Sequence, residues 1–159
     1  MRHPILIALA ALLLALGLSG TANAGPFDDA VAAYERGDHA TAFRLWRPLA
    51  DQGNARAQVI LGSMLEFGQV VPQNHAEAVK WYRLAADQGN AHAQVNLGGM
   101  YYTGQGVPQD HVQAHKWFNL AGAGGDEDGR KNRDIVAKVM TPAQIAEAQR
   151  LASEWKPKQ

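Results

Sequence analysis

Asp51-Gln-Gly-Asn-Ala-Arg-Ala-Gln-Val-Ile-Leu-Gly-Ser-Met64 is the stretch that decides the fold, because it returns 36 residues later as Asp87-Gln-Gly-Asn-Ala-His-Ala-Gln-Val-Asn-Leu-Gly-Gly-Met100. When residues 51–86 are laid over residues 87–122 without a gap, 22 of the 36 positions are identical. Self-similarity at a fixed period is typical of repeat proteins, in which a single unit cannot bury its own apolar face. The sequence therefore predicts a stack of similar units.

Capping residues and glycines divide each repeat into two helices. Asn54 and Asn90 are expected to cap a first helix (helix A), and Asn74 and Asp110 a second helix (helix B). A loop with glycine and proline separates the two helices, and a glycine ends each pair. The pattern predicts an all-α protein with about eight helices in antiparallel pairs.

The first 24 residues have the features of a secretory signal peptide. A basic start is followed by an uncharged apolar run from Ile5 to Leu18, and Ala22-Asn-Ala24 supplies a cleavage site of small residues. The run is short for a membrane span, although an uncleaved anchor is the alternative. We expect cleavage after Ala24, no stable membrane insertion afterwards, and a periplasmic or secreted protein.

The rest of the chain divides into helix pairs. We expect a degenerate first helical hairpin over 25–53, two regular units over 54–89 and 90–125, and a C-terminal capping hairpin over 126–159. A polar hairpin is what a stack of repeats needs to close its exposed end.

The capping hairpin is expected to begin with a charged helix from Arg130 to Met140. The helical period would turn Ile135, Val136 and Val139 towards the interior. A second helix should follow from the Thr141-Pro-Ala-Gln start signal.

Composition excludes several classes of function. The chain has no cysteine, which removes thiol catalysis, cysteine-ligated metals and disulfide bonds. Without Arg2, the 15 basic residues become 14 against 15 acidic residues, a formal charge of −1. No basic stripe is present to meet phosphates, so nucleic acid is not an expected partner.

The repeated pattern resembles the Sel-one-like repeat (SLR) family, which is similar to tetratricopeptide proteins. The shared motif is Ala-x-Ala-Gln-x-x-Leu-Gly-x-Met, followed by Gly, Val-Pro and Ala-x-x-Trp, and it occurs at 55–85 and 91–121. The resemblance is close over 54–125 and looser over 27–53 and 140–155. It implies a right-handed α-solenoid of antiparallel helix pairs in an exported bacterial member of the family.

The same residues have a clear packing role. Gly62 and Gly98 are expected to allow close approach of helices, and Trp81 and Trp117 are expected to be core residues, because a solenoid buries one face of every helix.

Metal and enzyme functions find little support in the sequence. His111 and His115 stand four residues apart and could share a zinc ion, but no third ligand is evident. No nucleophile elbow, Ser-x-x-Lys or phosphate loop occurs. We expect no metal, no cofactor and no catalysis. The alternative is an envelope enzyme acting on β-lactam or cell-wall substrates, as associated with some cysteine-rich relatives, whose cysteines this chain lacks. A third possibility is a chaperone-like or metal-carrying role.

The resemblance implies a protein or peptide partner, because in tetratricopeptide-like arrays the A helices line a concave surface that takes such ligands. If Ala93, Leu97 and Tyr101 face the core, the opposite side of helix A faces this groove. The predicted site residues are Arg56, Val59, Ile60, Ser63, Glu66, His92, Val95, Asn96, Gly99 and Tyr102. The alternative is that they are ordinary solvent-facing residues. We therefore expect a non-catalytic interaction scaffold or adaptor of the bacterial cell envelope.

Overall fold

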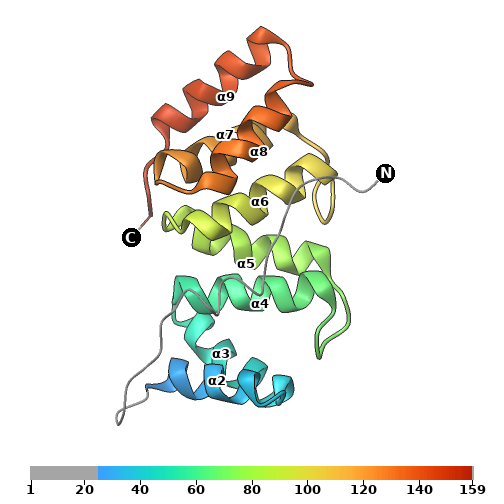
Figure 1. The fold of residues 1–159 in the computed structure, drawn as a ribbon, viewed down its shortest axis with the longest axis vertical. Helices are drawn as coiled ribbons and strands as arrows, with labels where there is room; N and C mark the ends of the chain where they lie inside the picture. Colours follow the sequence, from blue (N-terminus) through green and yellow to red (C-terminus); the bar gives the residue numbers. More distant parts are fainter. Residues whose placement is uncertain (1–24, 159) are drawn as a thin grey trace.

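The computed structural model describes residues 25–158, which form eight α-helices and no strand (Figure 1). The helices are α2 (Pro26–Glu35), α3 (His39–Asp51), α4 (Ala55–Phe67), α5 (His75–Asp87), α6 (Ala91–Thr103), α7 (His111–Ala123), α8 (Glu127–Ala137) and α9 (Pro142–Glu154). The prediction of an all-α solenoid of antiparallel helix pairs is confirmed. The predicted signal peptide, residues 1–24, lies outside the described residues.

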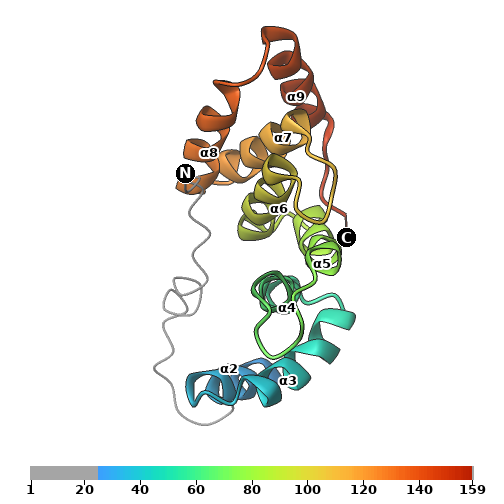
Figure 2. The ribbon, with the colours of Figure 1, turned by 90° about the vertical axis from the view of Figure 1, so that its right-hand side faces the viewer.

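The helix pairs stack into a curved rod. Figure 2 shows helices α2, α4, α6 and α8 on one side and helices α3, α5, α7 and α9 on the other. Because α2 and α8 project beyond α4 and α6, the side formed by the A helices is the inner side of the curve, which we call the concave face.

Within residues 25–158, no helix combines the length and the apolar character that crossing a membrane requires.

Equivalent hydrogen bonds shape the two regular units. Asn54 and Asn90 each accept an N–H from the residue three positions on, at 3.0 Å, which satisfies a free donor at the helix start. In the loops, Gln73 and Gln109 each donate from Nε2 to a carbonyl in the last turn of helix A, at 2.7 Å. The predicted caps are thus present, and the glutamines fix the loop against the helix that precedes it.

A buried glutamine closes each joint between units. Gln58 donates from Nε2 to the carbonyl of Ala50 at 3.0 Å, and Gln94 donates to the carbonyl of Ala86 at 3.3 Å. Both glutamines are buried, at 3% exposure. Each bond joins the start of an A helix to a carbonyl near the end of the preceding B helix, which also accepts the backbone N–H of the glycine that follows that helix.

Glycine sets the distance between the two helices of a unit. A Cβ on Gly62 would lie 2.7 Å from the ring of Tyr82, and a Cβ on Gly98 would lie 2.7 Å from the ring of Phe118. The predicted close approach is confirmed, and its partner is an aromatic ring on helix B in each unit.

The tryptophans of the B helices are core residues, as predicted. Trp46, Trp81 and Trp117 are 0%, 8% and 2% exposed. Trp155, at the end of α9, is half-buried and meets Trp117 edge-on, with the ring centroids 6.4 Å apart. Aromatic burial therefore runs through the B side of the whole stack.

The loops of the two units differ at one backbone position. Gly106 has φ +72°, and a Cβ there would lie 2.4 Å from the carbonyl oxygen of His75 in the preceding unit. The equivalent residue of the first unit is Val70, which also has φ 72° and is 49% exposed. A β-branched residue rarely adopts this conformation, so the first unit carries strain that the second unit avoids.

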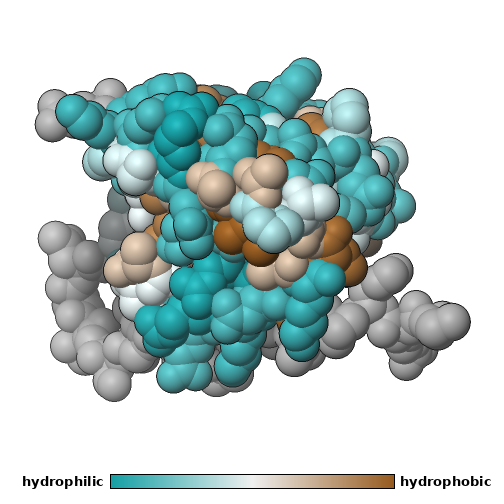
Figure 3. Space-filling view, turned by 90° about the horizontal axis from the view of Figure 1, so that it is seen from above, coloured by the Kyte–Doolittle hydropathy of each residue, from teal (hydrophilic) through white to brown (hydrophobic). Residues whose placement is uncertain are grey.

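The capping hairpin differs from its prediction at both ends of its first helix. Helix α8 begins at Glu127, not at Arg130, because the carboxylate of Asp126 accepts the N–H of Gly129 at 2.8 Å. The helix ends at Ala137, so the predicted inward orientation of the later Val139 is wrong and this side chain is 58% exposed. Seen from this end, the molecule shows a hydrophilic surface around a smaller hydrophobic area (Figure 3).

Candidate functional site

The ten predicted site residues lie on the two central A helices, α4 and α6. Arg56 and His92 are exposed, and Tyr102 is half-buried. The other seven are buried: Val59, Ile60, Ser63, Glu66, Val95, Asn96 and Gly99. These seven residues are less exposed than residues that line a solvent-facing groove would be, because a central helix has neighbours on several sides. Their role in binding stays a prediction.

A buried polar pair stands at the centre of the first unit. The hydroxyl of Tyr82 on α5 donates a hydrogen bond to Oε2 of Glu66 on α4, at 2.7 Å. The tyrosine is 0% and the glutamate 4% exposed. Ser63 and Asn96 lie beside the same hydroxyl, so side chains from three helices meet at this point. The sequence suggested Glu66, Ser63 and Asn96 but gave no sign of their buried partner on helix B.

Burial controls the protonation of this pair. Burial raises the pKa of Glu66, against the hydrogen bond from Tyr82 and the nearby His75, which lower it. Burial, and after it the carboxylate of Glu66, raise the pKa of Tyr82 well above its usual value. The tyrosine therefore keeps its proton at neutral pH and acts as the donor.

A Glu66→Gln variant should show a stability difference from the wild type that depends on pH. Glutamine can still accept the hydrogen bond of Tyr82 but cannot ionise. Because folding raises the pKa of Glu66 above its ordinary 4.5, the folded state holds this proton more tightly. The stabilisation is present below the unfolded pKa and is lost as pH rises through the folded pKa. Urea unfolding at about pH 4 and about pH 7 measures this effect. Between the two pH values, the free energy of unfolding of the variant should rise relative to that of the wild type, by about 1.4 kcal/mol for a pKa raised by one.

The control for this measurement is Glu35→Gln, which removes an exposed carboxylate at the end of α2. The same difference between wild type and Glu66→Gln at both pH values would contradict the assignment of a raised pKa.

The second unit has lost the polar pair as a whole. The position of Glu66 is taken by Tyr102, and the position of Tyr82 is taken by Phe118, which has no hydroxyl. Ser63 likewise becomes glycine. Buried polar groups need partners, so a donor and its acceptor disappear together when a repeat changes. The two units thus have the same helix packing but different polar side chains at equivalent positions.

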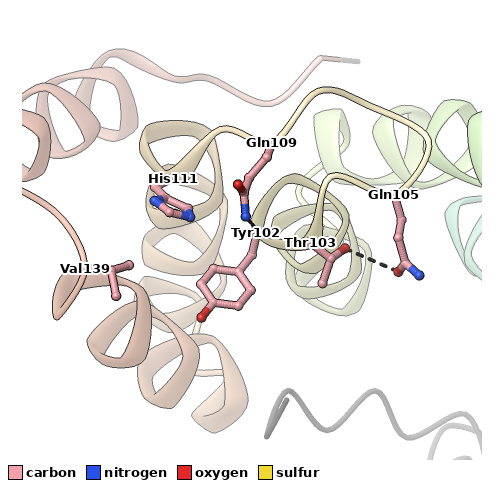
Figure 4. Close-up of a pocket in the computed structure, with 6 residues that line it drawn as sticks. All are labelled: Tyr102, Thr103, Gln105, Gln109, His111 and Val139. Atoms are coloured by element: carbon pink, nitrogen blue, oxygen red, sulfur yellow. Dashed lines mark hydrogen bonds between the residues drawn. The ribbon is translucent and has the colours of Figure 1, made fainter. Parts of the chain in front are cut away.

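Tyr102 instead borders a shallow hollow of about 410 Å³ at the loop edge of the second unit. Figure 4 shows its side chain on the same side of the hollow as His111 and Val139, which come from the start of α7 and the turn after α8. The rings of Tyr102 and His111 lie 5.6 Å apart and are tilted by 33°. The complete lining is Tyr102, Thr103, Gln105, Gln109, His111 and Val139. The hollow offers hydroxyl, amide and imidazole groups beside one exposed apolar side chain.

The histidines do not form a metal site in the described part of the chain. His111 packs beside an aromatic ring, whereas His115 is 3% exposed and its pKa is lowered, first by burial and then by the charge of Arg133. Among residues 25–158, no group of three or more His, Cys, Asp or Glu side chains is placed to hold a metal ion.

Comparison with protein families gives a match over more than half of the chain. A family model described as the Sel1 repeat matches residues 31–54, 55–90 and 91–126. A search of curated protein sequences finds no match.

Two solved structures show the same arrangement of helices. The chain is 34% identical to a protective antigen present in uropathogenic Escherichia coli strains, which displays an SLR fold, with a TM-score of 0.78 over 82% of this chain. It spans 29% of the length of that antigen. It is also 34% identical to a Sel1 repeat protein from Oxalobacter formigenes, with a TM-score of 0.63 over 69% of this chain and 85% of that protein.

Proposed function

Because the chain belongs to the Sel1 repeat family, whose repeats generally mediate protein–protein interactions, we propose that it is a non-catalytic scaffold of the bacterial cell envelope that binds a peptide or protein segment on its concave face. The fold itself does not carry this proposal, since function depends on the surface that a fold presents.

The distribution of differences between the two regular units supports the concave face as the binding surface. Helix A of the two units differs at six positions, and four of these fall within an arc of about 60° around the helix. The four pairs are Arg56/His92, Ile60/Asn96, Ser63/Gly99 and Phe67/Thr103. The capping asparagines, the buried glutamines of the joints and the glycines at the helix contacts are identical in the two units, whereas this stripe differs. This is the observation on which the proposal rests.

The exposed members of the stripe supply polar contacts for a ligand. Arg56 and His92 are the second residues of α4 and α6, so they repeat at the spacing of the units. Nδ1 of His92 lies 3.8 Å from the carboxylate of Asp126, at the start of the next A helix. A bound segment that follows the concave face would meet one such side chain for each unit.

The envelope location rests on the first 24 residues. A basic start, an apolar run and a small-residue cleavage site direct a bacterial chain to export. A scaffold that works outside the cytoplasm and lacks cysteine depends on packing alone for its stability.

Affinity capture from an envelope extract tests the proposal. The purified protein is immobilised, and the captured proteins are identified by mass spectrometry. The double change Arg56→Glu and His92→Glu reverses or adds charge on the concave face at two exposed positions. We expect it to reduce enrichment of a specific partner by about tenfold, equivalent to about 1.4 kcal/mol.

The matched control carries Arg44→Glu and Lys80→Glu, which alter exposed side chains of the B helices α3 and α5. Circular dichroism should show the same helicity for both double variants. Partner enrichment that falls equally in both, or in neither, would contradict binding on the concave face.

A further inference from the structure

The C-terminal segment, residues 155–158, packs back against the joint between the two regular units, where it contacts Asp87, Gly89 and Trp117. After α9 ends at Glu154, this segment runs along the B-helix side of the stack (Figure 2). The ring of Trp155 meets Trp117 edge-on, and the side chains of Trp155 and Pro157 lie over Gly89, within 4 Å of the position that a Cβ there would take. Glycine at this position leaves room for the segment.

The last contact of the segment uses both main chain and side chain. Lys158 donates its backbone N–H to the carbonyl of Asp87 at 2.7 Å. Its Nζ lies 2.6 Å from Oδ2 of the same aspartate, whose side chain is only 18% exposed. A residue at the end of helix α5 therefore recognises an extended chain and its positive charge together.

Three residues hold the C-terminal segment, namely Trp117, Gly89 and Asp87, and each has an identical counterpart 36 residues earlier. Their counterparts are Trp81, Gly53 and Asp51. These counterparts line an open groove of about 580 Å³, together with Leu84 and, at one rim, Lys158 itself. We call it the first-unit groove. Its volume is in the range of sites that hold ligands.

The first-unit groove has unused binding capacity. The carbonyl of Asp87 accepts the N–H of Lys158, whereas the equivalent carbonyl of Asp51 accepts no hydrogen bond from residues 25–158. Leu84 is 49% exposed, whereas its counterpart Leu120 is half-buried in the cluster that also contains Trp155. The same surface is covered at the joint between the two regular units and open at the joint between the opening hairpin and the first unit.

Arg47 contacts two of the residues that line the groove, Asp51 and Trp81, but only weakly. It pairs with Asp51 at 3.3 Å, and its guanidinium lies 5.3 Å from the ring centre of Trp81. Both charged side chains are about half exposed, so water screens the pair and a ligand can displace the arginine easily. The counterpart of Arg47, Arg83, donates a hydrogen bond to the hydroxyl of Tyr101 instead, which leaves Asp87 to the C-terminal segment.

We propose that the first-unit groove binds an extended segment of a partner protein in which an aromatic residue is followed, two positions later, by proline and then by a basic residue. The aromatic ring packs on Trp81, the proline on Gly53, and the basic residue pairs with Asp51, whose carbonyl accepts its N–H. The groove lies on the B-helix side, so this binding is separate from that of the concave face.

A synthetic peptide with the sequence of residues 153–158, Ser-Glu-Trp-Lys-Pro-Lys, is the probe. It carries a fluorescent label at its N-terminus, and anisotropy is measured during titration with the purified full chain. We expect saturable binding at one site that weakens about tenfold in Asp51→Asn and strengthens by up to about fivefold in Arg47→Ala, which frees the aspartate and the ring. A peptide with Trp replaced by Ala and the last Lys by Glu should not bind.

Three results would overturn the proposal. One is no binding, or binding that Asp51→Asn leaves unchanged. The second is a change in binding only in Asp87→Asn, because the peptide would then merely displace the C-terminal segment. The third is a dimer in size-exclusion chromatography with light scattering that Asp51→Asn abolishes, because the occupant would then be a second copy of the chain. The Arg56→Glu and His92→Glu variant should bind the peptide normally, which separates this test from that of the concave face.

Discussion

Replacing Gly106 with alanine is expected to lower the free energy of unfolding by about 2–5 kcal/mol, because the left-handed conformation costs about 1–2 kcal/mol and overpacking about 1–3 kcal/mol. The backbone of Gly106 has φ +72°, and its new Cβ would lie 2.4 Å from the oxygen and 2.5 Å from the carbon of the His75 carbonyl group. Main-chain atoms at a helix start cannot move aside as a flexible side chain can. Urea unfolding measures the loss.

Gly37 provides the matched control. It has a similar φ of +81°, but a Cβ there would meet no atom within 4 Å. Gly37→Ala should therefore cost only the conformational part, about 1–2 kcal/mol. In the other direction, Val70→Gly should stabilise the protein by about 0.5–1 kcal/mol, since the strain that it removes, about 1–2 kcal/mol, exceeds the cost of the chain entropy that glycine adds to the unfolded state, about 0.5–1 kcal/mol. Equal losses at Gly106 and Gly37 would show that the loop does not press on the preceding unit.

Replacing Gly98 with alanine is the second change with a large expected effect. On helix propensity alone, alanine should stabilise α6 by about 0.5–1 kcal/mol. The new Cβ would, however, lie 2.7 Å from the ring of Phe118, which is 0% exposed and cannot turn away. We expect a net loss of about 1–3 kcal/mol. Thermal and urea unfolding should both show it.

A smaller partner should reverse part of this loss. In the Gly98→Ala/Phe118→Leu double variant, the leucine leaves room for the methyl group, so the combined loss should be about 1 kcal/mol less than the sum of the single losses. Gly62→Ala should be worse than Gly98→Ala, because the ring that it displaces belongs to Tyr82 and carries the hydrogen bond to Glu66. Strict additivity in the double-mutant cycle would contradict the contact.

Features that depend on neighbours in the sequence could be predicted. Asn54 and Asn90 cap their helices because a side-chain oxygen reaches an N–H three residues on. Small residues that recur at the same position of helix A indicated close helix packing at Gly62 and Gly98, and the structure confirms it. The periodicity that repeats these local signals is what made the solenoid predictable.

Features that depend on contacts between distant residues could not be predicted. The partner of Glu66 lies 16 residues away on another helix, and Lys158 meets Asp87 across 71 residues. Val139 shows a different cause, since its helical face was inferred for a helix that ends two residues earlier, at Ala137. A helical period also cannot tell a central helix, enclosed on several sides, from an end helix, which explains the unexpected burial of Ser63.

The single difference between Val70 and Gly106 also decides how this chain can be lengthened. A copy of residues 90–125 inserted after residue 125 would bring a glycine loop against the start of the preceding B helix, as Gly106 now lies against His75. A copy of residues 54–89 at the same place would bring a valine there instead, and its branched side chain would meet main-chain atoms. We therefore expect that copies of the second unit can lengthen the stack, whereas the first unit is suited to the short opening hairpin that precedes it.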